Sequence, residues 1–292
     1  MAALQAFRPA VSGVVRNPIV VLVTALFGVF QLPNLLVQSA SPVLASAISL
    51  VTFGVMVLVL PFFQGGLLGM ADEAIAGDTR LGTLVAVGKA NYVSLLLGYF
   101  VLLAVNMIFG FLAFMGAIIV IIGGSVAGMN GGVGTGIGGG AGTGVDAPVL
   151  GFDPMLLAVV GVVAVGLVLV YLLVTFFVQF YAHAVVLDGT ELVDGFRRSA
   201  GLVRSNLLSV FGYTVLLLVG SLLVGTLAAA ASFAIGPQPP GSPIAELIPF
   251  APSTGVVVAG AIGYVLLTGV AGAFYATYSV AFYRRISGTV AN

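Results

Sequence analysis

Two stretches of the chain share a pattern that organises the rest of it. Residues 188–213 read DGTELVDGFRRSAGLVRSNLLSVFGY, and residues 77–99 read GDTRLGTLVAVGKANYVSLLLGY. Each begins with Asp and Thr beside a Gly, runs through a short amphipathic segment to a basic residue and then Asn, and enters an apolar run. Asn91 therefore aligns with Asn206. We interpret the two stretches as a repeated elbow in which a capped helix leads into a membrane span.

The second copy of this elbow carries extra charge. Between its Thr and its Asn it is longer than the first by four residues, about one helical turn. We expect a helix that is capped near Asp188 or Thr190, with one apolar and one charged face. Such a helix usually lies under the membrane spans with its arginines near lipid phosphates. The sharper alternative is a site for an anionic ligand. The candidate contacts for either are Arg197, Arg198, Arg204 and, from the first copy, Lys89.

Composition places the chain in a membrane. Hydrophobic residues make up 60% of it and charged residues only 6%, and the mean hydropathy is +1.24. Soluble proteins carry about 25% charged residues. No polar segment is long enough to bury a core of its own. The chain has no Cys, which excludes disulfides, thiolate metal sites and cysteine nucleophiles.

Six apolar runs are long enough to cross a bilayer, which needs about 20 helical residues. We therefore predict an all-α, polytopic integral membrane protein, with six transmembrane helices and short amphipathic interfacial helices in one domain over residues 1–292. Residues 1–16 are predicted to form an interfacial N-terminal helix. Pro33 and Pro61 predict kinks in the first two spans. The six runs are 17–38, 43–70, 91–122, 154–187, 205–236 and 254–283.

The connections between spans predict orientation. If the spans are threaded alternately, all nine Lys and Arg residues fall on one side. The positive-inside rule then predicts a multi-pass protein of the cell membrane with both termini cytoplasmic. Two external loops remain, a Gly-rich one at 123–153 and a Pro-rich one at 237–253. A GxGxxG match in the first loop lacks a βαβ context and does not predict nucleotide binding.

A metal site is one possibility at the inner ends of the spans. His183 and Asp188 end the fourth run, while Asp72, Glu73 and Asp78 end the second. If these ends meet, an imidazole and several carboxylates could hold a metal. No pair has the spacing of a known ligand motif, so polar residues capping helix ends are the simpler interpretation. We expect no catalytic residue, metal or cofactor.

Small residues four apart would let helices approach closely. Such spacing usually serves packing within one chain, and assembly with a second copy or a membrane-protein partner is the alternative. The bilayer is the expected surrounding partner, and no nucleic acid is expected. The pairs are Gly65 and Gly69, Ser221 and Gly225, Ala259 and Gly263, and Gly272 and Ala276.

Three segments of the chain resemble a known protein family: NPIVVLVTALFGVFQLP, PFFQGGLLGMADEAIAGDTRLGTLVAVGKANYVSLLLGY and YAHAVVLDGTELVDGFRRSAGLVRSNLLSVFGY. With them the chain resembles an uncharacterised family of six-span membrane proteins of haloarchaea. That family is similar in pattern to the membrane domain attached to some bacterial glycerophosphodiester phosphodiesterases. The resemblance implies fold and location and carries over no catalytic residue.

These observations predict a non-enzymatic membrane component, either permease-like or an accessory or scaffold subunit. Near the predicted midplanes of the spans there is no Asp, Glu, Lys, Arg or His, which disfavours coupled transport. A membrane-embedded enzyme that acts on lipid head groups at the cytoplasmic face is the alternative.

Overall fold

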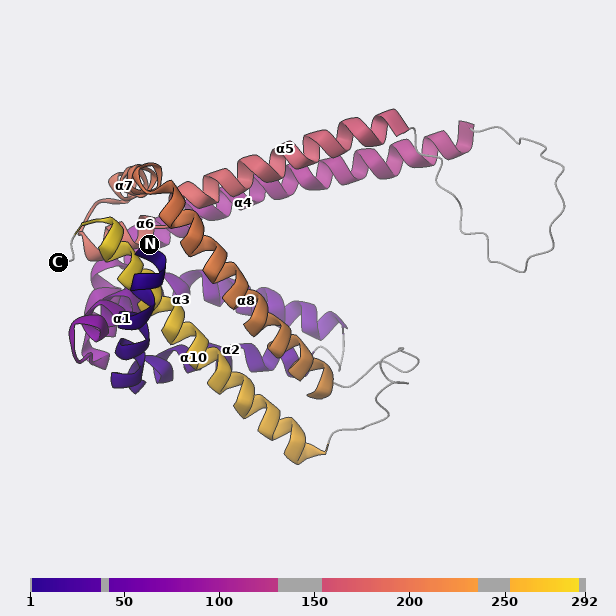
Figure 1. Ribbon diagram of the computed structural model, residues 1–292. Coiled ribbons are helices and arrows are strands. Elements are labelled where there is room, and N and C mark those ends of the chain that lie inside the picture. Colours follow the sequence, from indigo (N-terminus) through magenta and orange to yellow (C-terminus); the bar gives the residue numbers. More distant parts are fainter. Residues whose placement is uncertain (1, 38–41, 131–153, 236–252, 289–292) are drawn as a thin grey trace. The chain divides into compact units, whose positions relative to one another are not determined.

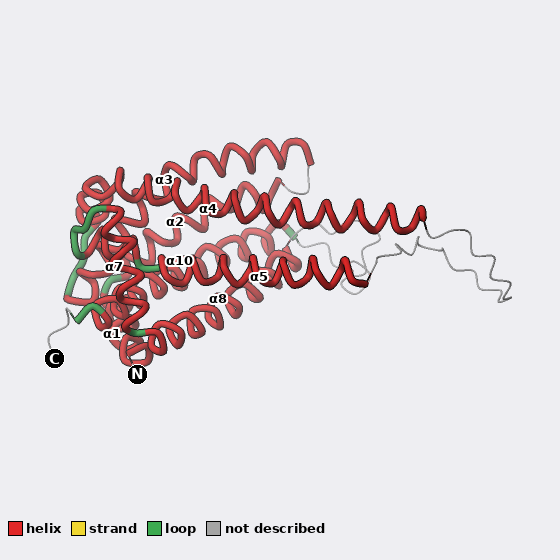
Figure 2. The backbone as a smooth tube through the Cα atoms, turned by 90° about the horizontal axis from the view of Figure 1, so that it is seen from above, coloured by secondary structure: helices red, strands yellow, loops and turns green. Residues whose placement is uncertain are grey.

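Helices account for nearly all of the chain that can be described (Figures 1 and 2). The computed structural model describes residues 2–37, 42–130, 154–235 and 253–288. No strand occurs in these ranges, which confirms the all-α prediction. Five helical stretches are long and apolar enough to cross a membrane, and a sixth results if the bent pair α1 (Ala2–Arg16) and α2 (Pro18–Val37) counts as one span. The polytopic membrane class is therefore confirmed, with five or six crossings.

Several predicted boundaries were wrong. Helix α3 (Pro42–Ala76) and α2 contain Pro61 and Pro33 without interruption, and the predicted kinks at these residues stay predictions. Helix α4 (Leu81–Asn130) begins ten residues earlier than expected and also takes in residues 123–130 of the predicted Gly-rich loop. The predicted run 154–187 is divided into α5 (Pro154–Val178) and α6 (Tyr181–Leu187). The rest of the Gly-rich loop and nearly all of the Pro-rich loop lie outside the described residues.

The chain divides into two compact units, residues 1–99 with 177–292, and residues 100–176. The second unit contains the later part of α4 and most of α5. Within it the Tyr171 hydroxyl donates to Asn106 Oδ1 at 2.7 Å, and the rings of Tyr171 and Phe109 meet edge to face with centroids 5.3 Å apart. These contacts join the two helices of this unit.

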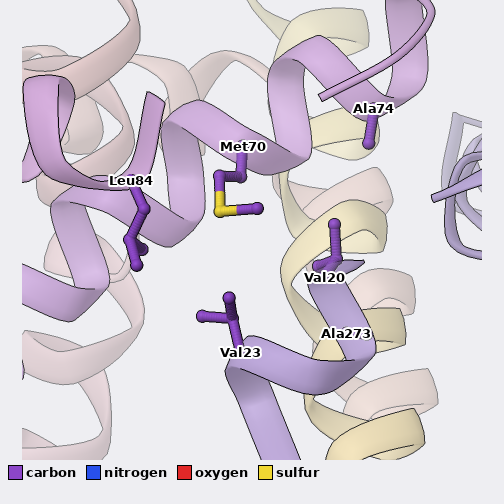
Figure 3. Packing of buried hydrophobic residues seen from close by; sticks show 6 residues of the cluster. All are labelled: Val20, Val23, Met70, Ala74, Leu84 and Ala273. Atoms are coloured by element: carbon purple, nitrogen blue, oxygen red, sulfur yellow. The ribbon is translucent and has the colours of Figure 1, made fainter. Parts of the chain in front are cut away.

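The first unit also contains α7 (Leu192–Ser205), α8 (Leu207–Ile235) and α10 (Thr254–Ile286). Small residues let its helices approach closely. A Cβ on Gly269 of α10 would lie 2.9 Å from the carbonyl oxygen of Val21 in α2. A Cβ on Gly13 of α1 would lie 3.1 Å from the carbonyl oxygen of Ala74 in α3. Figure 3 shows the apolar cluster that forms between α2, α3, α10 and the beginning of α4: Val20, Val23, Met70, Ala74, Leu84 and Ala273.

Burial in this unit is concentrated toward one end of its long helices. The buried residues of α3 lie on the C-terminal side of Phe53, and those of α10 lie on the C-terminal side of Thr268. By contrast, Leu58 of α3, Leu222 of α8 and Leu266 of α10 are each more than half exposed. Exposed apolar surface of this extent is unusual for a protein in water but is normal where lipid is the solvent. The packed end of the unit is also the end that carries its charged side chains.

Asn17 locks the bend between α1 and α2, which is 87°. Its side-chain nitrogen donates to the carbonyl oxygens of Gly13 at 3.0 Å and Gly77 at 2.9 Å, and its oxygen accepts from the backbone N–H of Thr79 at 2.9 Å. The residue is only 4% exposed, so these bonds replace the water that its amide would otherwise need. The bend is therefore tied to the turn between α3 and α4.

Candidate functional site

The ends of α3, α6 and α10 meet the middle of α7 in a group of four charged side chains and one tyrosine that we call the ionic cluster: Asp72, Asp188, Arg198, Tyr283 and Arg284. Arg284 binds Asp72 with two parallel hydrogen bonds of 2.8 and 2.7 Å. Asp188 lies at the C-terminal cap of α6, where it accepts from Arg198 Nε at 2.7 Å and from the Tyr283 hydroxyl. A guanidinium nitrogen of Arg284 lies 3.9 Å from Asp188 Oδ1. One carboxylate therefore joins two arginines from different helices.

Electrostatics favour this arrangement as an internal bridge. Two carboxylates face two guanidinium groups, so the formal charge of the ionic cluster is zero. The Asp188 side chain is only 10% exposed, and Arg284 is 23% exposed. A hydrogen bond with Tyr283 is the main cause that raises the pKa of Arg198. The negative charge of Asp188 raises this pKa further, while partial desolvation lowers it, and the net shift is upward. Arg198 therefore stays charged and keeps α7 attached to the end of α6.

His183 is the most isolated polar group beside the ionic cluster. It is 7% exposed, and neither ring nitrogen has a hydrogen-bond partner among the described residues. Its ring stacks on Tyr283 with centroids 5.4 Å apart and meets Phe180 edge to face. Three of the four carboxylates that could have joined it have other partners. Asp72 pairs with Arg284, Asp188 pairs with Arg198, and Glu73 accepts from two threonines. In the described ranges no three His, Asp or Glu residues are placed to hold a metal.

Two shallow grooves occur on the long helices. One has a volume of about 580 Å³ and lies between α4 and α5 in the second unit, where Asn106 and Tyr171 are its hydrogen-bonded polar residues. The other has a volume of about 320 Å³ and lies along α8. It is lined by Leu218, Ser221, Leu222, Gly225, Thr226 and Ala229. Both are mainly apolar, as expected for helix surfaces in contact with lipid or another helix.

Residues 1–286 match the family described as "Domain of unknown function (DUF7847)". The chain belongs to this family. No curated protein and no solved structure matches the chain. The ionic cluster and the Asn17 bend both fall within the residues that match the family.

The predicted anion contacts of this family member are not equivalent. Arg198 is held by Asp188, as described above. Arg197 lies 3.4 Å from Asp194, and both side chains are more than 60% exposed. The guanidinium of Arg204 lies over the Phe177 ring at 5.8 Å, within the range of a cation–π contact. Lys89 is exposed on α4. Lipid or ligand binding by these residues stays a prediction.

The apolar face of α7 does not have the expected surroundings. Phe196 stacks on Tyr181 with ring centroids 4.7 Å apart, and Val203 is fully buried. Ser199 is also fully buried; its hydroxyl donates to the carbonyl oxygen of Phe177 and accepts from the backbone N–H of Phe180. Most of this face therefore packs against protein at the break between α5 and α6, while Val193 at its beginning is 60% exposed.

Sequence reasoning missed three important residues. Tyr283 and Arg284 complete the ionic cluster, and Asn17 forms the α1–α2 bend. A partial signal for Asn17 was present, because a basic residue directly precedes it, while in the two elbows the basic residue lies two positions before the Asn. No local pattern indicated that Arg284 would reach Asp72, because 212 residues separate them.

Proposed function

We propose that the protein is a non-enzymatic accessory or scaffold component of the cell membrane that assembles through one face of α8. The observation that carries this proposal is a contrast between small-residue pairs. Gly65, Gly69 and Gly272 are packed against neighbouring helices within the first unit, so that an added Cβ would lie 3.0 Å or less from another residue. Ser221 and Gly225 are exposed, and an added Cβ on Gly225 would meet no described atom within 4 Å. The same small-residue spacing is used for packing inside the chain and is left open on α8. The pair Ala259 and Gly263 of α10 is also exposed and open, but the α8 pair in addition lines the groove along its helix.

The shape of α8 supports a helix as the occupant of this open face. Ser221, Gly225 and Ala229 recur every four residues, so they lie in one row along the helix. Leu218 and Leu222 border the row and form the walls of the groove. Small residues between larger ones allow close backbone approach, and a second copy of the same face is complementary to it under two-fold symmetry. We therefore take a second copy of the chain as the partner.

The charge distribution supports an orientation with both termini in the cytoplasm. The contacts of Asn17, Asp188 and Arg284 bring together the ends of the first unit that carry its basic residues. Basic residues concentrate on the cytoplasmic side of membrane proteins. The resemblance to a haloarchaeal family, and in pattern to the membrane domain joined to some phosphodiesterases, also supports a helper role. The internal pairing of the ionic cluster supports this role over an enzyme acting on lipid head groups.

Cysteine cross-linking in the membrane tests the proposal, because the chain has no native Cys. Ser221→Cys should give disulfide-linked dimers under mild oxidation. Leu223→Cys is the control, because residue 223 is also exposed but lies about 200° around the helix from residue 221. Cross-linking that is equal at the two positions, or absent at residue 221, would contradict the proposal.

A second pair of variants tests whether close approach is required. Gly225→Leu fills the row and should reduce the dimer fraction at least tenfold. Gly220→Leu makes the same change on the opposite side of α8, where Gly220 also has open space beside it, and should leave the dimer unchanged. If the two variants behave alike, the α8 face is not the contact. Solute flux through vesicles that contain only monomer would instead favour the permease-like role.

A further inference from the structure

Helix α1 has three distinct faces. Its first face consists of Ala3, Ala6, Ala10 and Gly13, which are buried against the first unit. Its second face is apolar but exposed: Leu4 is 62% exposed, Phe7 51% and Val15 75%. At about 100° per residue this face is centred about 120° from the buried one. The third face is polar and exposed, and consists of Gln5, Arg8, Ser12 and Arg16.

The bend at Asn17 sets the direction of these faces relative to a bilayer. Helix α2 is apolar along its length and is joined to α1 at 87°. If α2 crosses the membrane near its normal, α1 must lie nearly in the membrane plane. A helix in that position contacts hydrocarbon with one side and water with the other. The exposed apolar face and the polar face of α1 supply these two sides, while the small-residue face packs on protein.

We propose that α1 is a binding surface for the anionic phospholipids of one leaflet. The apolar face would enter the leaflet, and Arg8 and Arg16 would reach the phosphate groups at its border. Neither arginine has an ion pair within the described part of the chain; Arg16 donates to the carbonyl oxygen of Ser12 in its own helix. Both can therefore bind phosphate without breaking a salt bridge. An anionic leaflet attracts each basic residue that lies near its surface.

The contrast with α7 makes this assignment specific. Both helices end at an Asn that precedes an apolar helix, and both are strongly amphipathic. Helix α7, however, packs Phe196 and Val203 on protein and leaves Val193 of its apolar face exposed, and its Arg198 is held by Asp188. Only α1 of the two combines an exposed apolar face with arginines that have no carboxylate partner among the described residues. The lipid contact is thus assigned to α1.

Single-tryptophan variants in nanodiscs test the immersion of α1, because the chain has no native Trp. Val15→Trp places the probe on the exposed apolar face, and Ser12→Trp places it on the polar face. Lipids brominated on their acyl chains should quench the fluorescence of the apolar-face probe strongly and that of the polar-face probe weakly. Equal quenching of the two probes, or quenching of the apolar-face probe by aqueous iodide instead, would overturn the proposal. Protection of the apolar-face probe from both quenchers would indicate a protein partner and would also overturn it.

Competition between brominated phosphatidylcholine and phosphatidylglycerol then tests selectivity for anionic lipid. In the Val15→Trp variant we expect the anionic lipid to be preferred about fivefold or more. A reference probe introduced as Leu223→Trp, at an exposed position of α8, should show no preference. Adding Arg8→Gln and Arg16→Gln to Val15→Trp should bring the preference to about one. Adding Arg80→Gln instead, a change of an exposed basic residue before α4, should not. A preference that survives the double change, or that Arg80→Gln removes equally, would refute the role of α1.

Discussion

The two copies of the elbow pattern fold differently, although each contains the same features in the same order: a Gly, an amphipathic segment, a basic residue and an Asn. In the first copy, α4 passes through Lys89 and Asn91 without a break. In the second, α7 ends at Ser205, and α8 begins after Asn206. The two asparagines make the same local bond, since each side-chain nitrogen donates to the carbonyl oxygen four residues earlier at 3.1 Å. The Asn therefore permits a break but does not impose one.

Close packing on α3 explains why the first copy stays straight. A Cβ on Gly66 would overlap the carbonyl oxygen of Leu84, and a Cβ on Gly88 would lie 2.7 Å from that of Phe62. Leu95, beyond Asn91, is fully buried. Contacts on both sides of Asn91 therefore hold the chain against one continuous neighbouring helix, α3. A break at Asn91 would pull one half of this contact away.

The second copy has no continuous neighbour of this kind. The segment before it is interrupted between Val178 and Tyr181, and Ser199 bonds to the freed backbone groups of Phe177 and Phe180. The extra turn of this copy places Arg198 beside Asp188. Helix α7 is thus fixed to α6 and does not continue along the axis of α8. The chain therefore changes direction at Asn206.

The first copy should depend most on its glycine contacts. Gly66→Ala places a methyl group against the backbone of Leu84, which cannot move without shifting α4. We expect a loss of about 3 kcal/mol, at the upper end of the range for overpacking, measured as the free energy of unfolding in bilayers. Gly54→Ala in the same helix is the control, because an added Cβ there meets no described atom within 4 Å. If both changes lower the free energy of unfolding by a similar amount, close packing on α3 does not explain why the first copy remains one helix.

The second copy should depend on its ion pair instead. Asp188→Asn leaves Arg198 and Arg284 without this carboxylate. Loss of one partner from a fully buried pair costs about 3 to 5 kcal/mol, and we expect about 2 kcal/mol here because Arg198 is 43% exposed. Asp194→Asn makes the same chemical change in an exposed pair and should alter the free energy of unfolding by less than about 0.5 kcal/mol. Equal effects would mean that Asp188 does not act as a bridge.

The sequence predicted features that depend on composition and on local spacing. The helical membrane class, α1, and a helix before Asn206 could be predicted, because apolar length and amphipathic periodicity are properties of short segments. The two copies of the elbow were also recognised. Their different outcomes could not be predicted, because the break at Asn206 depends on what lies beside it. For the same reason the start of α4 was placed too late, at residue 91.

The ionic cluster shows the same limit. Asp188 and Arg198 were both noted as charged residues of one elbow, but their pairing requires the turn at Gly189, which has a positive φ of 64°. The match of Arg284 to Asp72 depends on how α10 packs against α3. The alternative of a metal site grouped His183 with these carboxylates, whereas in the structure Asp188 and Asp72 pair with arginines. Charge pairing across helices is a property of the packed unit.

The smallest effect that separates the two copies should come from the asparagines themselves. Asn206→Ala removes the side-chain bond to Leu202 at a residue that lies between two helices, so we expect a loss of about 1 kcal/mol. Asn91→Ala removes the equivalent bond to Val87 inside a continuous helix, where the better helix propensity of Ala, about 0.6 kcal/mol, offsets most of the loss. Unfolding of both variants in the same bilayer measures the difference. If Asn91→Ala costs as much as Asn206→Ala, the asparagine bond has the same role in both copies, and neighbouring contacts alone do not explain why only one of them breaks.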